Sequence, residues 1–487
     1  MMGELLLILK PVFRLLYQHF DDFTIYTING VFFIPLSVLL SSYMKPLRCF
    51  VTVFILLLVT LSCRSIKPNQ IKKMSPPAVM NDEKYNPFIH GAVIQDRKRL
   101  PILYATNRVP ADSDSWEPHY LSTRSESVRL GVAGIGVADI DKTWDDMAMI
   151  EASRNLPRKP LLEVLDVEEY GILDTSLTLF SSNDLPQDYL ELPKERFLIE
   201  LKSQLRQTDI KDVFIFVHGY NVNFENPLLV TAQLWHYLGY RGSFISYGWP
   251  ATPKPTAYRK DMDTASMSSR SFRLFLDFLA EQDEIHRIHI LGYSSGTRVV
   301  TEALYQKALE LNDLPAEEAQ MKTKLGTVIL SNSDMDRGQF SSYIMDGELN
   351  ILERMNLYTS SKDLVLRGSQ IVLSLPRMGQ TMTDEELTPA IKDFFDKEEK
   401  LSIIDVSDAE KVATNGGHFY FLESPWVSSD VLLNLWTGFD PEERGLEKHE
   451  NLPIWTFPDD YIERSRAVLD EFISATPSSI DIREMNE

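Results

Sequence analysis

Between residues 212 and 333, short apolar runs alternate with longer segments of helical periodicity. Each run consists largely of Val, Ile, Phe and Leu. The apolar and polar residues do not alternate, as they would in a strand with one solvent-exposed face, and this pattern is typical of parallel strands buried on both sides. The apolar runs are DVFIFV (212–217), GSFISYG (242–248), RIHILGY (287–293) and GTVILSNS (326–333). The intervening helices are predicted at 225–239, 265–282 and 295–311. This order predicts an α/β fold with a mainly parallel sheet and helices on both faces.

Further strands and one helix are predicted on either side of this block. The expected strands are 101–106, 127–137, 355–363 and 401–408, with weaker candidates at 162–167 and 176–181, and a helix is expected over 192–207. We expect a single domain over 98–475 with an N-terminal β extension, followed by a tail at 476–487.

Charge and cysteine content exclude several classes of function. The formal net charge is −21, so nucleic acid is an unfavourable partner, because phosphate backbones require a basic face. The two cysteines, Cys49 and Cys63, both lie near the N-terminus. The rest of the chain therefore cannot hold a disulfide, a thiolate zinc site or a cysteine nucleophile. No cofactor or metal is expected, and the oligomeric state is not indicated.

The N-terminal segment has the features of an export signal. Basic residues after Met44 precede an apolar run from Phe50 to Leu61, which is too short to span a bilayer as a helix. The run ends at Cys63, so residues 44–65 resemble a bacterial lipoprotein signal with Cys63 as the lipidated residue. Residues 1–62 are then a leader, of which 1–43 are not translated, and 63–97 form a polar tether. The alternative is a plain transmembrane anchor. Both place the protein at a membrane, and the first predicts an extracytoplasmic lipoprotein.

A nucleophile is indicated by the segment LGYSSGTR (291–298). Gly292, Ser294 and Gly296 have the spacing G-x-S-x-G, between a predicted strand and a predicted helix. A nucleophilic serine on such a sharp turn stands free above the sheet, and side chains two residues away would collide with the turn. We therefore interpret Ser294 as a nucleophile.

Donors for a developing oxyanion are expected at two backbone positions. One is the N–H of Ser295, directly after the nucleophile. The other is the N–H of Tyr220, in the loop His218-Gly219-Tyr220-Asn221 after an earlier strand. Gly219 allows the backbone to approach a substrate carbonyl. His218 is interpreted as a residue that braces this loop.

The general base is expected to be His418, in the glycine-rich segment TNGGHFYF (414–421) beyond the last strand. Ligand-facing loops lie at the carboxyl ends of parallel strands, so its position is suitable. The acid that orients it is less determined. The order Ser–Asp–His is satisfied by Asp363, Asp334, Asp336 and Asp405. Position favours Asp363 and then Asp334, although Asp334 and Asp336 could instead buttress the site.

The motifs resemble a bacterial family of α/β hydrolases of largely unassigned function. That family carries a VHGYN oxyanion loop and a serine elbow usually written HSMG. The resemblance covers roughly residues 100–465 and rests on YATNR (104–108), FIFVHGYNVNF (214–224), ISYGWP (245–250), AYRKDMDTA (257–265), LGYSSGTR, LYTSSKDLVL (357–366), GGHFYF, Arg444 and IWTFPDDY (454–461). It implies the α/β-hydrolase fold, with Ser294, Asp363 and His418 as the triad. The chain departs from the family at Tyr293 and Ser295, which flank the nucleophile, so substrate preference need not carry over.

These observations predict a serine hydrolase that cleaves a small-molecule or lipid carboxylic ester outside the cytoplasm. An amidase or peptidase would use the same residues. A membrane-tethered scaffold that keeps the fold without turnover is the alternative of another class. A lipase is a further variant, in which 371–382 would form an apolar cover over the site.

Overall fold

The computed structural model describes residues 26–28, 31–33, 69–80, 85, 87, 97–112, 119–138, 142–152, 159–181, 188–383, 385–412, 416–450 and 452–475. The chain divides into two units, residues 1–66 and 67–487. In the first unit, the described residues are the antiparallel pair β1 (Tyr26–Ile28) and β2 (Val31–Phe33). The predicted leader around Met44, including Cys63, lies outside the described residues. None of the described helices is long and apolar enough to cross a membrane.

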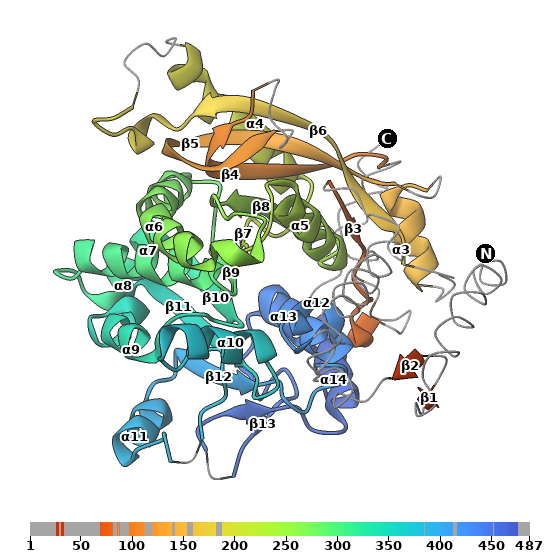
Figure 1. The fold of residues 1–487 in the computed structure, drawn as a ribbon. Helices are drawn as coiled ribbons and strands as arrows, with labels where there is room; N and C mark the ends of the chain where they lie inside the picture. The colour runs from red at the N-terminus through yellow and green to blue at the C-terminus, as the bar shows by residue number, and fades with distance from the viewer. Residues whose placement is uncertain are drawn as a thin grey trace, which may run out of the picture. The chain divides into compact units, whose positions relative to one another are not determined.

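The second unit is built on one sheet of twelve strands, ordered β13-β14-β12-β11-β10-β9-β7-β8-β4-β5-β6-β3 (Figure 1). The strands are β3 (Gln70–Lys72), β4 (Leu100–Pro110), β5 (Tyr120–Val137), β6 (Leu161–Ile172), β7 (Val213–Val217), β8 (Ser243–Gly248), β9 (Ile288–Tyr293), β10 (Leu325–Ser331), β11 (Leu352–Thr359), β12 (Leu401–Asp405), β13 (Glu447–Lys448) and β14 (Trp455–Thr456). In the spatial order of the sheet, the neighbouring strands between β4 and β14 pair in parallel. The strands beyond them at the two edges, β5, β6 and β3 on one side and β13 on the other, pair antiparallel. The predicted parallel sheet with an N-terminal β extension is therefore present.

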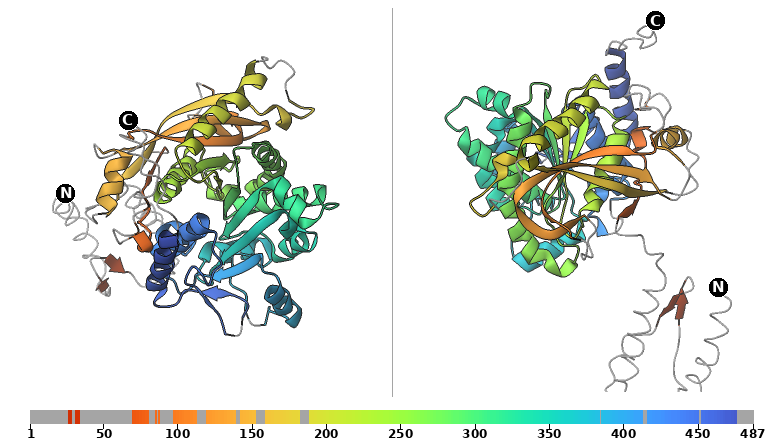
Figure 2. Two further views of the ribbon diagram at one scale, coloured as in Figure 1. Left: turned by 180° about the vertical axis from the view of Figure 1, so that it is seen from behind. Right: turned by 90° about the horizontal axis from the view of Figure 1, so that it is seen from above.

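Helices cover both faces of this sheet (Figures 1 and 2). They are α3 (Trp144–Ala152), α4 (Asp188–Arg206), α5 (Glu225–Tyr237), α6 (Tyr258–Ala280), α7 (Gly296–Glu310), α8 (Ala316–Thr323), α9 (Arg337–Met345), α10 (Leu364–Leu373), α11 (Pro389–Lys397), α12 (Tyr420–Glu423), α13 (Pro425–Thr437) and α14 (Tyr461–Ala475). Successive side chains of β7 enter opposite cores. Ile215 packs with α4, α6 and α7, and Phe216 with α5, α12 and α13. The absence of polar alternation in these strands follows from burial on both faces.

Two sequence expectations differ from the structure. The weak strand predicted at 176–181 is instead a turn that follows η5 (Asp174–Ser176), and Leu179 and Phe180 there are exposed. Apolar residues stabilise a strand only when it has a neighbouring strand to pair with and a core against which its side chains can be buried. The polar tether predicted over 63–97 is partly folded: β3 pairs with β6, and Val79 is buried beside α13, where its N–H donates to Ser429 Oγ.

One buried carboxyl group is expected to lower the stability of this fold near neutral pH. Glu348, in the short helix η7 (Glu348–Ile351), is fully buried, and neither carboxylate oxygen has a hydrogen-bond partner among the described residues. Burial raises the pKa of Glu348 well above its usual value of 4.5. A carboxyl whose pKa is raised on folding contributes most to the free energy of unfolding at low pH. That contribution is lost as the pH rises above the pKa that the group has in the unfolded chain.

We therefore expect Glu348→Met to stabilise the protein. The free energy of unfolding should rise by about 1–3 kcal/mol at pH 8, because an unpartnered polar group is removed and a side chain of similar length remains. The gain should shrink towards pH 5, where the wild-type carboxyl binds its proton in the folded state. Chemical denaturation at both pH values measures this. Glu317→Met, at an exposed position on α8, is the control and should show no such gain. A gain of equal size at both pH values would contradict the prediction.

Candidate active site

Ser294 lies on the turn that connects β9 to α7, with a backbone φ of 51°, in the left-handed region. Few residues other than glycine adopt this conformation, and a positive φ at such a turn is typical of functional positions. The Ser294 N–H donates to the Ser331 carbonyl at 2.9 Å, and its carbonyl accepts from the Thr297 N–H at 3.0 Å. The turn is thereby held by β10 on one side and by α7 on the other.

The glycines around Ser294 are required by close packing. A Cβ on Gly296 would lie 2.2 Å from the His218 carbonyl oxygen, so a side chain there would drive β7 and α7 apart. Gly292 is less constrained, since its Cβ would meet the Val300 side chain at 3.1 Å. A Cβ on Gly219 would lie 2.9 Å from the Ser294 Cβ. The loop after β7 therefore rests directly on the nucleophile turn.

His418 lies within hydrogen-bonding distance of Ser294, although 124 residues separate them in the sequence. The His418 Nε2 is 2.9 Å from Ser294 Oγ, and both side chains are buried. Gly416 and Gly417 precede His418 with φ values of 83° and 73°. A Cβ on Gly417 would lie 2.5 Å from the Lys362 carbonyl, so this loop packs on the backbone just before Asp363.

Asp363 is the acid that reaches His418. Its Oδ2 lies 2.7 Å from His418 Nδ1 and is fully buried, and its Oδ1 caps α10 by accepting from the N–H groups of Val365 and Leu366 at 3.0 and 2.9 Å. A carboxylate oxygen can only accept, so the hydrogen of His418 is on Nδ1 and Nε2 is free to accept from Ser294. The helix cap and the histidine partner thus fix the same carboxylate.

The other candidate acids lie elsewhere. Asp336 caps α9 by accepting from the Gln339 N–H at 3.0 Å, and Asp405 accepts from Ser407 and Thr381. Asp334 lines the same cavity as Ser294, but its carboxylate accepts from the hydroxyl groups of Tyr258 and Ser369, and no hydrogen bond or ion pair joins it to His418 in the described part of the chain. These contacts are those of a residue in the wall of the cavity.

Asn332, which the sequence does not indicate as a site residue, is a neighbour of Asp363. Its Nδ2 donates to Asp363 Oδ2 at 3.0 Å, from a left-handed backbone with φ of 53°. Its N–H donates to the Tyr420 hydroxyl, which donates to the Tyr358 carbonyl. The Tyr358 hydroxyl in turn donates to Asp430, which forms a buried ion pair with Arg444 at 2.8 Å. Arg444, from the C-terminal part of the family motif, is thus connected by hydrogen bonds to Asn332, which contacts Asp363.

The expected oxyanion donors lie beside the nucleophile. Tyr220 and Ser295 line the cavity that contains Ser294, and no hydrogen bond from either backbone N–H to another described residue is found. His218 Nδ1 lies 2.7 Å from the Gly219 carbonyl and its ring stacks on Trp249. Because the carbonyl and the following N–H of a trans peptide point in opposite directions, fixing the Gly219 carbonyl also fixes the direction of the Tyr220 N–H. Asn221 is exposed at this turn with φ of 61°.

The YATNR motif braces the same loop. Thr106 Oγ1 donates to the Gly248 carbonyl, and the Asn107 amide donates to Ser268 Oγ at 3.0 Å. Arg108 is fully buried and donates to the Val222 carbonyl at 3.3 Å, just after the oxyanion loop. The charge of Arg108 adds to burial in lowering the pKa of His218 to about 3, so the His218 ring is neutral near pH 7.

The residues in which the chain departs from the family motif have partners at the site. The Tyr293 hydroxyl donates to the His418 carbonyl at 3.0 Å, and its ring packs against His418 and Phe419. Burial, followed by the charge of Asp363, raises the pKa of Tyr293 well above its usual value, so its hydroxyl keeps its proton. Ser295 Oγ donates to Asp334 Oδ2 at 3.3 Å. Both substitutions are therefore accommodated by contacts within the site.

The cavity at Ser294 has a volume of about 250 Å³. Its lining residues are Tyr220, Pro255, Tyr258, Ser294, Ser295, Asp334, Val365, Leu366, Gly368 and Ser369. The segment 371–382, considered as an apolar cover, is not among them. The exposed fraction is 80% for the Ile371 side chain and 3% for Met378, which packs into the core. The segment therefore has one end in solvent and another in the core, and it does not form a continuous cover over the nucleophile.

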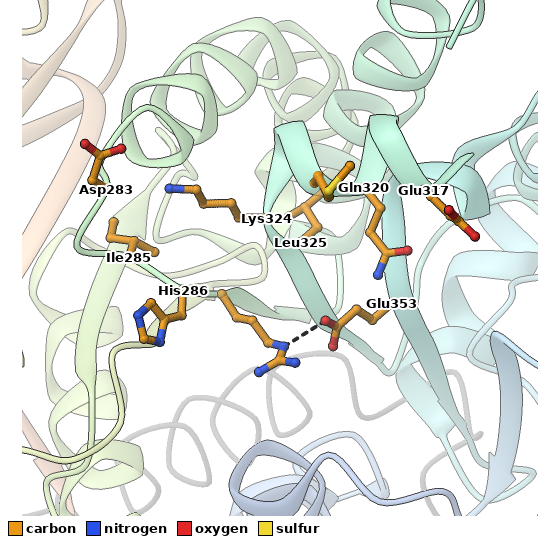
Figure 3. Close-up of a pocket in the computed structure, with 10 residues that line it drawn as sticks. Asp283, Ile285, His286, Glu317, Gln320, Lys324, Leu325 and Glu353 are labelled. Atoms are coloured by element: carbon orange, nitrogen blue, oxygen red, sulfur yellow. Dashed lines mark hydrogen bonds and ion pairs between the residues drawn. The ribbon is translucent and has the colours of Figure 1, made fainter. Parts of the chain in front are cut away.

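A second hollow, of about 710 Å³, lies at the opposite end of the strands from Ser294 (Figure 3). It is lined by residues at the amino ends of β9, β10 and β11, including His286, Lys324 and Glu353. Arg287 and Glu353 pair there at 2.7 Å. No cluster of three or more potential metal ligands occurs anywhere in the described part of the chain. Since parallel sheets place ligand-facing loops at their carboxyl ends, the cavity at Ser294 is the candidate active site.

Comparison with known proteins agrees with this architecture. Residues 194–434, just under half of the chain, match the model of a family described as "Alpha/beta hydrolase of unknown function". No protein of curated function matches the chain. Among solved structures, a lipase-esterase related protein from Clostridium acetobutylicum ATCC 824 is 11% identical, with 47% of this chain and 94% of that chain covered. Its TM-score is 0.23, so this likeness carries no argument. By its mainly parallel sheet with helices on both faces, and by a family match that covers residues 194–434, the chain has the α/β-hydrolase fold, as the sequence predicted.

Proposed function

We propose that the protein is a serine hydrolase that cleaves a carboxylic ester through an acyl-enzyme intermediate. The observation that carries this proposal is the continuous hydrogen-bonded arrangement of Ser294, His418 and Asp363, at 2.9 and 2.7 Å, beside a cavity. A scaffold without turnover has no need to keep three buried polar groups in this geometry.

The arrangement supports a two-step mechanism. His418 Nε2 takes the proton of Ser294 as Oγ attacks the substrate carbonyl, and Asp363 stabilises the imidazolium that forms. We expect the backbone N–H groups of Tyr220 and Ser295, two residues that line the cavity, to donate to the oxyanion. His418 then protonates the leaving alcohol. In the second step, water attacks the acyl-enzyme with His418 again as base, and Ser294 is released with the acid product.

Esters are proposed ahead of amides because they are more easily cleaved acyl donors. An amidase or peptidase would use the same atoms, so only turnover separates the two. p-Nitrophenyl acetate and the matched p-nitroacetanilide measure the ratio directly, and we expect the ester alone to be turned over at a useful rate. Turnover of the anilide at a similar rate would assign the protein to the amidases.

The experiment that tests the proposal is active-site labelling. A fluorophosphonate probe should react with the folded protein, and mass spectrometry of the digested adduct should place the label on Ser294. Prior incubation with phenylmethylsulfonyl fluoride should prevent labelling. Folded protein that takes up no label would favour the scaffold alternative, and a label on another serine would overturn the assignment of the nucleophile.

His218 gives a further prediction. We expect His218→Ala to lower kcat for p-nitrophenyl acetate by about 10- to 100-fold, because the Tyr220 N–H loses the contact that directs it towards the oxyanion. KM should change less, since the ground-state carbonyl needs this donor less than the transition state does. The pKa of about 3 for His218 means that the ring does not titrate between pH 5 and 9. The pH profile of kcat should therefore keep its shape, and a displaced profile would contradict the positioning role.

The location proposed for the protein is extracytoplasmic, with the chain anchored to a bacterial membrane by a lipid on Cys63. It is supported by the basic, apolar and Cys-terminated order of residues 44–65. Mass spectrometry of the N-terminal peptide from membranes of the producing cell tests it. A diacylated Cys63 at the mature N-terminus is expected, and a chain that begins at Met1 would overturn it.

A further inference from the structure

One wall of the catalytic cavity is made of hydroxyl groups gathered around a buried carboxylate. Asp334 is 2% exposed and lies with Tyr258 and Ser369 in the cavity lining. The Tyr258 hydroxyl lies 2.7 Å from Asp334 Oδ2, and Ser369 Oγ lies 2.6 Å from Asp334 Oδ1. The Tyr258 and Ser369 oxygens are also 2.5 Å apart. We call Tyr258, Asp334 and Ser369 the polar wall.

The hydrogen bonds of the polar wall determine what it can recognise. Each hydroxyl carries one hydrogen, and the contacts with Asp334 and between the two hydroxyls use both hydrogens within the wall. Burial and the charge of Asp334 raise the pKa of Tyr258, so its proton is retained. Some lone pairs of the Asp334 carboxylate are used by Tyr258, Ser369 and Ser295, and the other lone pairs of the three side chains remain to accept from a ligand. The polar wall accepts hydrogen bonds and has no hydrogen left to donate.

The charge behind the polar wall disfavours a cationic ligand. Arg298 Nε and Arg377 Nε lie 3.7 and 3.9 Å from the two carboxylate oxygens of Asp334. Both guanidinium groups also donate to the Asp334 carbonyl, at 2.7 and 3.5 Å. Two positive groups therefore face one carboxylate, and a third cation would meet net repulsion. A neutral hydrogen-bond donor meets no such cost.

Part of the remaining lining is apolar, and the cavity is small. Pro255, Val365 and Leu366 line it, and Val365 is 37% exposed at its edge. The volume of about 250 Å³ accommodates a short ester, and we expect a long acyl chain to extend into solvent.

We infer that the preferred substrate is a short-chain ester that carries a hydroxyl group near its carbonyl, bound through that hydroxyl at the polar wall. This inference rests on the proposed hydrolysis at Ser294. The hydroxyl belongs either to the acyl part or to the alcohol part, and in both cases it donates to the Tyr258–Asp334–Ser369 oxygens. An ester without the hydroxyl makes no such hydrogen bond to the polar wall, which lowers its rate of acylation relative to the hydroxylated ester.

Matched pairs of esters test the inference on the wild-type protein. Ethyl glycolate is compared with ethyl propanoate for a hydroxyl on the acyl part, and 2-hydroxyethyl acetate with propyl acetate for a hydroxyl on the alcohol part. Each kcat/KM is divided by the rate of hydroxide-catalysed hydrolysis of the same ester. We expect the hydroxylated ester of one pair to be favoured about tenfold or more. Acetylcholine supplies a cation instead and should show no advantage over propyl acetate.

Variants then assign the preference to the polar wall. Ser369→Ala and Tyr258→Phe should each bring the favoured ratio close to one, with unchanged thermal unfolding as the condition for reading the result. Ser342→Ala is the matched control, since Ser342 lies exposed on α9 with its Oγ bonded to the Gly338 carbonyl. It should keep the wild-type ratio.

The outcomes separate this inference from the proposed function. Turnover of p-nitrophenyl acetate and labelling of Ser294, without preference in either pair, would overturn the inference and leave the hydrolase. A preference for acetylcholine, or a ratio unaffected by both variants, would also overturn it. Absence of labelling and of all turnover in folded protein would remove the proposed function, and the inference with it.

Discussion

Ser294→Ala is expected to lower kcat/KM for ester hydrolysis by on the order of 10⁵-fold and to abolish labelling by a fluorophosphonate probe. The change removes the one oxygen that can attack, while His418, Asp363 and the backbone donors remain. Some catalysis over water should persist, because the oxyanion donors still polarise the carbonyl and a water molecule can occupy the vacated position.

The fold should tolerate this substitution. Among the described residues, Ser294 Oγ has one hydrogen-bond partner, His418, and the turn is held by backbone bonds to Ser331 and Thr297. Alanine keeps the Cβ that the φ of 51° already accommodates. Thermal unfolding and circular dichroism should therefore match the wild type. Ser342→Ala on α9 serves as the control and should retain labelling. Turnover by Ser294→Ala within tenfold of the wild type would end the case for acyl transfer at this residue.

Asp363→Asn should lower kcat by roughly 10⁴-fold while leaving the fold intact. Asparagine is as good a helix cap as aspartate, so its Oδ1 can still accept from the Val365 and Leu366 N–H groups. Its amide nitrogen then takes the place of Oδ2, which accepts at present from both His418 Nδ1 and Asn332 Nδ2. A donor facing His418 Nδ1 places the imidazole hydrogen on Nε2, where it can no longer accept the proton of Ser294.

Two measurements distinguish this tautomer effect from unfolding. Steady-state kinetics should show the loss mainly in kcat, and denaturation should show a decrease of only about 1–3 kcal/mol in the free energy of unfolding, because the Asn332 amide loses its acceptor. Asp334→Asn provides the comparison between the two acids, because the Asp334 carboxylate is bonded to Tyr258 and Ser369 instead of to His418. It should alter substrate preference more than kcat on p-nitrophenyl acetate. A larger loss of kcat in Asp334→Asn than in Asp363→Asn would reverse the assignment of the acid.

Local sequence pattern was sufficient for much of the fold and part of the site. The apolar runs of β7, β8, β9 and β10 predicted a parallel sheet because burial on both faces removes polar alternation. The spacing of Gly292, Ser294 and Gly296 indicated the turn because its steric demands are local. The weak run at 176–181 failed for the complementary reason, since a strand needs a neighbour that its own sequence does not contain.

The partners of the candidate residues could not be predicted in this way. The sequence favoured Asp363 over Asp334 by position and by the family resemblance, but both follow strands in the order Ser–Asp–His, so it left Asp334 open as an alternative. The difference arises because the loop before His418 packs on Lys362, which brings the imidazole to Asp363 and leaves Asp334 to Tyr258 and Ser369. Asn332 has no sequence signal at all, because its amide acts across the end of the sheet on a residue from the next strand.

From its sequence alone, this chain could be assigned a doubly covered parallel sheet, a serine on a strained turn and a histidine in a glycine-rich loop. These features depend on periodicity and on steric limits within a few residues. The contact between the acid and His418, the packing of the oxyanion loop through His218 and Arg108, and the acceptor character of the cavity wall were decided only by the tertiary structure. Each of them depends on contacts between segments tens to more than a hundred residues apart, which form only when the strands bring their carboxyl ends to one edge of the sheet.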